Sequence, residues 1–169
     1  MFLSIANRFS HKPVCTFPKE IESCGIICKQ TYNNETYILV VKGIYSEKWS
    51  LPKGNKYNYE TEEECAMRET YEETGIFIRL PDRQFTRVPM GRNVYFITSF
   101  DPYEDDYFSK RCLSPSIIPS IEQEINDEVS DIRWMTLSQL RKRKETCNKD
   151  LRTLISDKKL WFIQKIFHE

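Results

Sequence analysis

Two apolar runs rich in β-branched residues stand close together near the start of the chain. They cover residues 24–29 and residues 36–43, whose sequence is TYILVVKG. The segment between them, Tyr32-Asn33-Asn34-Glu35, consists of residues that are typical of a tight turn. This pattern predicts a β-hairpin, followed by a shorter third strand at residues 48–51.

The pattern becomes helical over residues 61–74. Thr61, with Glu64 three residues later, forms the capping box that begins a helix. Gly75 suits the position just after the last helical residue, where the backbone often turns left-handed. We therefore expect a well-defined helix with both of its ends marked.

Further strands are predicted at residues 76–80, 84–88 and 93–100, and a last short strand at residues 132–135. Residues 101–120 carry three prolines and mixed charge, so we expect a loop or an insertion there.

From residue 138 onward the chain again has helical periodicity. Its apolar residues recur at spacings of three, four and seven, which makes one stripe, formed by Leu151, Leu154, Ile155, Phe162 and Ile166. The fold class we expect is α/β, with helices flanking a mixed sheet. A domain at residues 21–169 would follow an N-terminal extension at residues 1–20 and would include a basic, amphipathic C-terminal helix at residues 147–168.

Composition fits one domain of this kind. The chain has 169 residues, of which 40% are hydrophobic, and 25 basic residues balance 25 acidic ones. Zero net charge gives no global signal for nucleic acid or membrane. The first fifteen residues fit neither a secretory signal nor a membrane span, so we expect a cytoplasmic protein with no membrane partner. The sequence gives no sign of a required protein partner. The six cysteines are expected to be reduced thiols.

Three carboxylates share one face of the predicted central helix. Glu69, Glu72 and Glu73 are related by i, i+3 and i+4 spacing. Like charges at these spacings repel each other, so either water screens them or a cation binds between them. Carboxylate oxygens are the ligands that Mg²⁺ and Mn²⁺ prefer. Taken alone, such a triplet is also common on solvated helix faces.

The triplet does not stand alone, because a glycine and a further glutamate precede it at fixed distances. This segment resembles the Nudix box, with Thr70 as its one departure, since an aliphatic residue is usual there. The matching positions are Gly54, Glu60, Arg68, Glu69, Glu72, Glu73, Gly75 and Ile76.

The resemblance implies a Nudix-type α/β/α sandwich and a metal-dependent enzyme that cleaves phosphoric anhydride bonds. Its metal ligands, for Mg²⁺ or Mn²⁺, would be Glu69, Glu72 and Glu73, with the Gly54 carbonyl as a further candidate. Arg68 would orient a carboxylate or contact substrate, and Glu60 would support the loop or a second ion. Glu72 and Glu73 would also be catalytic.

Residues around the box resemble the Nudix domain of the mRNA-decapping catalytic subunit. The loop Trp49-Ser50-Leu51-Pro52-Lys53-Gly54 is similar to that of decapping enzymes and of dinucleoside polyphosphate hydrolases, and Lys53 would contact a substrate phosphate. The segment from Glu128 to Trp134 is similar to one whose glutamate reaches the metal site. Glu128 would then be a metal ligand or the general base, with Glu124 as an alternative.

The C-terminal region adds a local charge signal. From residue 138 onward there are nine basic and four acidic residues, an excess that suits an RNA backbone, although a solvated amphipathic helix would look the same. The resemblance implies RNA-binding residues here, and the candidates are Lys142, Arg143, Lys149 and Arg152.

The cellular decapping subunit has a helical regulatory domain in front of its Nudix domain. In this chain only about twenty residues precede the first predicted strand. In this the chain resembles compact decapping proteins of large DNA viruses, for which the host cytoplasm would be the location. The aromatic candidates for cap recognition are Phe17, Tyr57 and Tyr95.

Three functions therefore compete. The first is mRNA decapping, which releases 7-methylguanosine diphosphate from capped RNA and leaves a 5′-monophosphate. The second is hydrolysis of dinucleoside polyphosphates or diphosphoinositol polyphosphates. The third is an RNA-binding module without catalysis, and the intact box argues against it.

Overall fold

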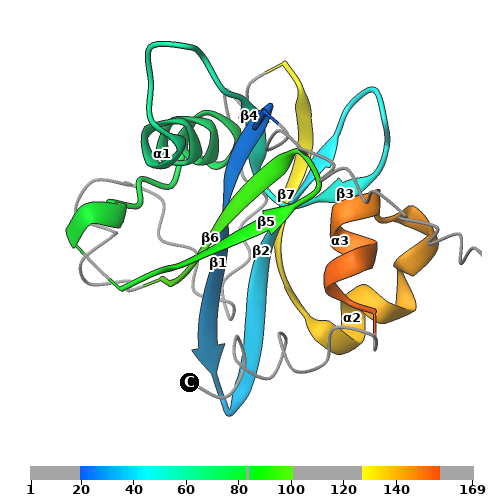
Figure 1. Cartoon of the computed structure of the whole chain (residues 1–169). Helices are drawn as coiled ribbons and strands as arrows, with labels where there is room; N and C mark the ends of the chain where they lie inside the picture. The colour runs from blue at the N-terminus through cyan, green and yellow to red at the C-terminus, as the bar shows by residue number, and fades with distance from the viewer. Residues whose placement is uncertain (1–19, 83, 101–126, 157–169) are drawn as a thin grey trace, which may run out of the picture.

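The computed structural model describes residues 20–82, 84–100 and 127–156, which form a mixed sheet between helices (Figure 1). The strands are β1 (Ser23–Tyr32), β2 (Glu35–Gly43), β3 (Trp49–Ser50), β4 (Lys53–Asn55), β5 (Thr86–Met90), β6 (Asn93–Ser99) and β7 (Val129–Thr136). The helices are α1 (Glu62–Thr74), α2 (Leu137–Lys142) and α3 (Lys149–Leu154), with short 3₁₀ turns at Leu80–Asp82 and Lys144–Thr146.

The predicted hairpin is confirmed as β1 and β2, which pair antiparallel from Lys29 opposite Ile38 to Tyr32 opposite Glu35. Both residues of its turn are left-handed, with φ of 49° at Asn33 and 61° at Asn34. Asparagine tolerates this conformation better than most residues, and two such residues match the right-handed twist of the strands that they join.

The sheet runs in the order β3-β2-β1-β6-β5, while β4 pairs with β1 and β7 pairs with β2. Only β1 and β6 are parallel to each other among these pairs. The start of β1 pairs with β4 and its end pairs with β2, so β1 changes its neighbour along its length. The sheet therefore divides at one end, where β4 and the start of β7 lie.

Helices cover both faces of the sheet, with α1 on one side and α2 and α3 on the other (Figure 1). Because side chains alternate along a strand, β2 contributes to both hydrophobic cores. Leu39 and Val41 belong to the core on the side of α1, and Ile38 and Val40 belong to the other core. This arrangement is the α/β sandwich that the sequence predicted.

The central helix begins and ends as predicted. The side chain of Thr61 accepts a hydrogen bond from the backbone N–H of Glu64, and the Glu64 carboxylate accepts one from the N–H of Thr61. Gly75 closes the helix with φ of 70°, and its N–H donates to the carbonyl of Tyr71. These local bonds hold the acidic face of α1 in a fixed position relative to the preceding loop.

The prediction of a strand at residues 76–80 is wrong. Ile76, Ile78 and Leu80 are buried under α1, but the segment pairs with no described strand. The backbone N–H of Leu80 donates instead to the sulfur of Met67 on α1. The alternation arises because an extended segment crosses the core, which buries every second side chain without any strand partner.

The helical region from residue 138 is interrupted. It forms α2, a 3₁₀ turn and α3. Residues 157–168 of the predicted C-terminal helix lie outside the described residues. The N-terminal extension up to residue 19 and the predicted loop at 101–120 also lie outside them. A capping box at Thr136 and Gln139 begins α2, and the Asn148 side chain caps α3. In the described part of the chain, no helix is long and apolar enough to cross a membrane.

Candidate active site

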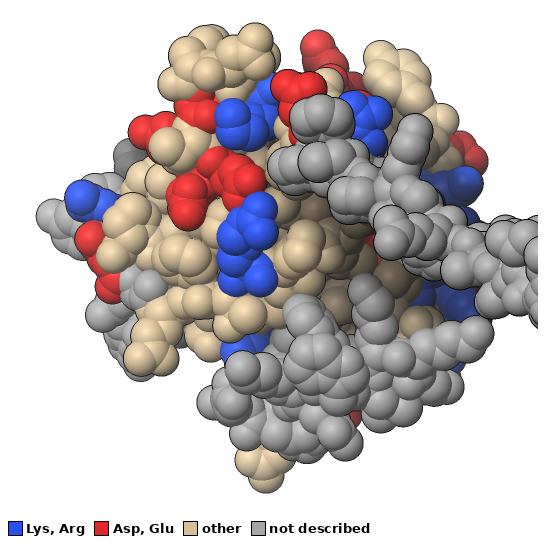
Figure 2. All heavy atoms as spheres, in the orientation of Figure 1, with Lys and Arg blue, Asp and Glu red and all other residues tan. Residues whose placement is uncertain are grey.

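Arg68 connects the loop after β4 to the acidic face of α1. Its guanidinium donates to both oxygens of Glu60, at 2.7 and 3.0 Å, and to Glu69 at 2.7 Å. It also donates to Glu72 at 3.1 Å and to the carbonyl of Asn55 at 3.0 Å. Arg68 therefore orients the neighbouring carboxylates, and its guanidinium is already occupied by these contacts. Figure 2 shows acidic and basic side chains close together on the face of the molecule that is seen in Figure 1.

Glu60 holds the loop. Besides the pair with Arg68, its carboxylate accepts a hydrogen bond from the backbone N–H of Tyr57 at 2.8 Å. The hydrogen bonds from Arg68 hold the pKa of Glu60 below its usual range, and Glu60 in turn raises the pKa of Arg68. The pair therefore stays fully charged and positions the loop.

Gly54 and Glu69 are in close contact. A Cβ atom at Gly54 would overlap the carboxylate of Glu69, so any larger residue at this position would displace the Glu69 side chain. The Gly54 carbonyl accepts a hydrogen bond from the thiol of Cys65 at 3.7 Å. Burial raises the pKa of Glu69, an effect that Arg68 opposes and that the charges of Glu72 and Glu128 reinforce.

Glu73 is the most perturbed carboxylate of the helix. It is half-buried, and it accepts a hydrogen bond from the backbone N–H of Lys53 at 3.0 Å. Burial raises the pKa of Glu73 to about 8, and the charges of Glu69 and Glu128 also raise it. An acidic group with this pKa next to other carboxylates is typical of a functional site.

Glu128, from the turn before β7, lines the same cleft as Glu73 and Lys53. This cleft has a volume of about 360 Å³ and is open to solvent. The pairing of β7 with β2 brings Glu128 there, since Val129 stands opposite Gly43 at the end of β2. The structure thus brings together residues from three distant segments of the chain. The alternative Glu124 lies outside the described residues.

Glu72 stands apart from this cleft. Its side chain is 44% exposed and pairs with Arg68. Within residues 20–82, 84–100 and 127–156, no three acidic, histidine or cysteine side chains already converge on one point as a metal shell. The donors nevertheless fit a hard divalent cation in their chemistry, because they are all carboxylates and the mutual repulsion of Glu69, Glu73 and Glu128 favours a positive charge among them.

The predicted RNA-binding residues lie on the other side of the sheet from α1. Lys142 and Arg143 end α2, Lys149 and Arg152 belong to α3, and all four are exposed. Asn148, which caps α3, lines the cleft. Lys149 therefore follows directly on a residue that lines the cleft.

Of the aromatic candidates, Tyr95 is fully buried and its hydroxyl donates to Asp150 at 2.6 Å, so it cannot receive a base. Tyr57 lies under the guanidinium of Arg68 and stacks on Tyr59. Phe17 lies outside the described residues. Sequence reasoning missed the cleft residues Tyr45, Ser46, Lys48 and Asn148, because no motif marks the loop between β2 and β3.

Part of this chain is similar to a known protein. A 52-residue segment is 42% identical to mRNA-decapping enzyme subunit 2 of Arabidopsis thaliana, and the match covers 31% of this chain and 13% of the plant protein. The chain thus matches only a small part of that longer relative.

Solved structures share the fold at low identity. One is the Ap4A hydrolase of C. elegans in a binary complex, with 15% identity, a TM-score of 0.51, and coverage of 80% of this chain and 92% of the other. Another is a bifunctional NMN adenylyltransferase/ADP ribose pyrophosphatase of Francisella tularensis, complexed with AMP and a Mn ion. Its identity is 20%, its TM-score 0.52, and the coverage 83% of this chain and 41% of the other. These plant, nematode and bacterial proteins lend no support to the resemblance to viral proteins.

The NUDIX domain family matches residues 25–155, which include every described strand except the first two residues of β1 and all of the helices up to α3. Because this match covers most of the chain and contains the intact glutamate motif, the protein belongs to the NUDIX domain family and is a hydrolase of pyrophosphate bonds.

Proposed function

We propose that the protein is an mRNA-decapping enzyme, which hydrolyses the 5′ cap to release 7-methylguanosine diphosphate and leave a 5′-monophosphate on the RNA. The observation that carries this proposal is the position of Glu128. It lies at the cleft with Glu73 and Lys53, at the start of the strand whose sequence resembles the corresponding segment of decapping enzymes. The partial identity to a plant decapping subunit supports the same substrate class.

The residues of the site have distinct tasks in this proposal. Glu69, Glu72 and Glu73 would hold Mg²⁺ or Mn²⁺ with Glu128, and the Gly54 carbonyl is a further candidate. A divalent cation bound there would neutralise charge on the phosphoryl oxygens and acidify a bound water.

Glu128 would accept the proton of the attacking water, because it is exposed at the cleft and free to approach a substrate. Lys53 would pair with a phosphate, since it is one of the residues that line the cleft, while its backbone N–H is bonded to Glu73. Arg68 would position Glu69 and Glu72.

The RNA chain would leave the cleft along α2 and α3. Residues 137–156 contain six basic and two acidic residues, and one of the acidic residues, Asp150, points inward to Tyr95 and Asn93. The exposed surface of this segment is therefore more basic than its sequence indicates. Lys142, Arg143, Lys149 and Arg152 would contact phosphates there.

The cleft itself favours a second candidate, the hydrolysis of dinucleoside polyphosphates or diphosphoinositol polyphosphates. Its volume of about 360 Å³ is in the range of small-molecule sites. The shared fold with an Ap4A hydrolase is compatible with this alternative, in which the basic helices would have no role in substrate binding.

Product analysis separates the two functions. Cap-labelled RNA, free cap analogue, dinucleoside tetraphosphate and a diphosphoinositol polyphosphate are each incubated with the protein and Mn²⁺. Decapping predicts labelled 7-methylguanosine diphosphate from long RNA, and its absence with Glu73→Gln. Cleavage of a small molecule with intact RNA left untouched would replace decapping by the second candidate. A Tyr32→Ala variant, changed at the distant hairpin turn, controls for nonspecific loss of activity.

A further inference from the structure

The loop between β2 and β3 places an aromatic residue, Tyr45, at the border of the cleft. Tyr45 is 86% exposed and lines the cleft together with Ser46 and Lys48. A large aromatic side chain gains nothing from this position in the free protein, since almost all of its surface remains in water. An exposed ring at the border of an active-site cleft is a ready contact for a ligand with a flat apolar face.

The loop that carries Tyr45 is held in place by backbone hydrogen bonds. The N–H of Gly43 donates to the carbonyl of Lys48 at 3.1 Å, and the N–H of Glu47 donates to the carbonyl of Gly43 at 2.9 Å. The N–H of Ile44 donates to the carbonyl of Glu128 at 2.9 Å. Tyr45 therefore follows directly on a residue that is bonded to Glu128, the proposed base.

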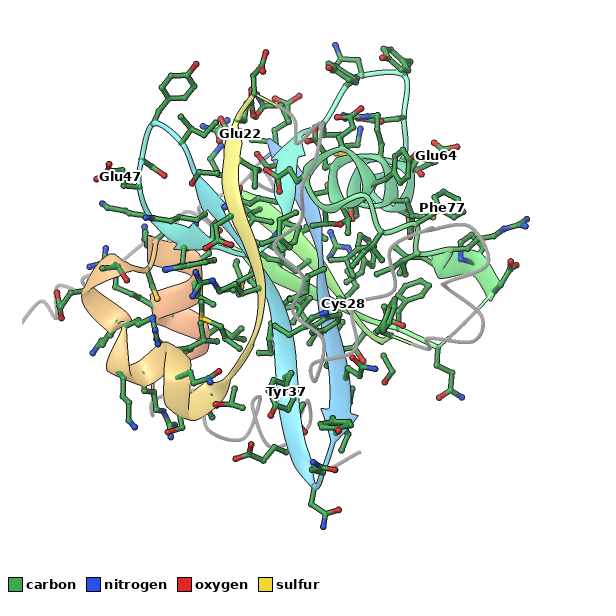
Figure 3. All side chains as sticks on the ribbon, turned by 180° about the vertical axis from the view of Figure 1, so that it is seen from behind. Glu22, Cys28, Tyr37, Glu47, Glu64 and Phe77 are labelled. Carbon is green, nitrogen blue, oxygen red and sulfur yellow. The ribbon has the colours of Figure 1, made fainter. Side chains whose placement is uncertain are left out.

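Glu47 allows this loop to close by adopting a left-handed conformation, with φ of 52°. In Figure 3, Glu47 marks the loop on one side of the molecule and Glu64 marks α1 on the other. The loop and α1 thus approach the site from different sides.

The other groups at the cleft suit the remaining parts of a nucleotide. Lys48 and Lys53 provide two positive charges for phosphates. The Asn148 side-chain oxygen already accepts from the N–H of Leu151 at 2.9 Å, so its NH₂ group is the part left for a ligand. The Ser46 hydroxyl oxygen accepts from the backbone N–H of Lys48 at 3.3 Å, so its O–H is a further donor for a ligand beside Tyr45.

We propose that this cleft binds the nucleoside diphosphate part of the substrate, with its base stacked on Tyr45 and its phosphates between Lys48 and Lys53. The proposal deepens the proposed function, because it assigns the part of the substrate that leaves as the diphosphate. Tyr45 is then a specificity-determining residue for substrates that carry a base at this end.

Competing aromatic side chains are less suited. One face of Tyr57 is covered by Arg68 at 4.5 Å, and the ring also stacks on Tyr59 at a centroid distance of 5.3 Å. Neither Tyr57 nor Tyr59 lines the cleft, although Tyr59 is 84% exposed. Tyr59 is therefore a matched control, with the same side chain and nearly the same exposure, in the loop between β4 and α1.

Calorimetric titration without metal tests the proposal independently of catalysis. The ligands are 7-methylguanosine diphosphate, GDP, ADP and pyrophosphate, which lacks a base. We expect Tyr45→Ala to raise the Kd of the nucleotides at least about fivefold, since stacking of a base on an aromatic side chain strengthens binding by about this factor or more. Tyr45→Phe and Tyr59→Ala should stay within about twofold of the wild type, and no Tyr45 variant should change the Kd of pyrophosphate.

Unchanged nucleotide affinity in Tyr45→Ala, or an equal loss for pyrophosphate, would overturn the proposal. Lys48→Met adds a second arm, because loss of a phosphate contact should weaken pyrophosphate and nucleotides alike. The outcome is separate from that of decapping. If RNA is not cleaved but ADP binding depends on Tyr45, the base contact stands and decapping falls. If RNA is decapped and Tyr45→Ala binds nucleotides normally, decapping stands and the proposed base contact falls.

Discussion

The α-carbon of Gly54 lies against the carboxylate of Glu69, so that a methyl group between them would overlap the carboxylate oxygens. The loop after β4 and the acidic face of α1 therefore meet without any intervening side chain. Gly54 has no left-handed φ, so its requirement for glycine comes from this contact and not from its own backbone conformation.

Replacing Gly54 by alanine should displace Glu69 and reduce kcat by about 100-fold or more, because small displacements of catalytic groups have effects of this size. Steady-state kinetics with Mn²⁺ measure the change. Gly91→Ala is the matched control, since Gly91 has φ of 73° and open space around it. That variant should lose about 1 kcal/mol of stability from backbone strain and keep its kcat. Normal activity in Gly54→Ala would show that the Glu69 position is unimportant.

Arg68→Lys tests whether the geometry of the guanidinium, rather than its charge, organises the site. Lysine keeps the charge but cannot contact both oxygens of Glu60 while also reaching Glu69. We expect kcat to fall on the order of 10-fold to 100-fold, as for other residues that orient metal ligands. Affinity for Mn²⁺, measured by calorimetry, should fall with it. A variant with normal metal affinity and reduced kcat would instead indicate direct contact between Arg68 and the substrate.

The raised pKa of Glu73 predicts a pH dependence of stability in the metal-free protein. Its folded pKa of about 8 lies above the ordinary value of 4.5, so the folded state holds the proton more tightly than the unfolded state. The stability from this group is complete below pH 4.5 and is lost as the pH rises through 8. After allowance for solvent screening we expect the loss to be about 2–3 kcal/mol.

Chemical denaturation of the wild type and of Glu73→Gln from pH 5 to pH 9 measures this loss. The difference between the two proteins isolates Glu73, because the opposing shifts at Glu60 and Glu62 occur in both. Mg²⁺ should stabilise the wild type more at pH 9 than at pH 5, since it binds the ionised form. If the free energy of unfolding changed with pH in the same way in both proteins, the raised pKa of Glu73 would be contradicted.

Thr70 predicts a stabilising substitution. It is fully buried, and no described residue is a hydrogen-bond partner of its hydroxyl. Thr70→Val removes the buried hydroxyl while keeping the shape, so the free energy of unfolding should rise by about 1 kcal/mol with activity unchanged. Thr74→Val is the matched control on the same helix.

The hydroxyl of Thr74 donates to the carbonyl of Thr70 and accepts from the N–H of Ile76, so its removal should instead destabilise the protein by about 1–2 kcal/mol. Thermal denaturation compares the two variants. A loss of stability in Thr70→Val would mean that its hydroxyl is bonded in solution.

Charge reversal at α3 tests the RNA path. Lys149→Glu combined with Arg152→Glu should lower kcat/KM on long capped RNA. The salt dependence of RNA binding should also become weaker, by an amount that corresponds to the loss of about two phosphate contacts. Cleavage of cap dinucleotide, which has no RNA body, should be unchanged and is the internal control. Equal losses on both substrates would place the effect in the cleft, and no loss on RNA would remove these two residues from the binding surface.

Local signals predicted the parts of this protein that depend on neighbours along the chain. Asn33 and Asn34 mark the hairpin turn, and Thr61, Glu64 and Gly75 mark both ends of α1, because each of these features rests on hydrogen bonds within a few residues. Local signals failed at residues 76–80. There the alternation of buried and exposed side chains is real, but strand formation depends on a partner that the segment does not have.

The sequence by itself determined the acidic helix, because the spacing of Arg68, Glu69, Glu72 and Glu73 along one helix follows from helical geometry. Tertiary structure decided which other residues join them. The register of β7 on β2 brings Glu128 to the cleft, the closed loop after β2 presents Tyr45 there, and the packing of α3 buries Tyr95 against Asp150. These outcomes depend on strand pairing and packing between distant segments, which no local pattern contains.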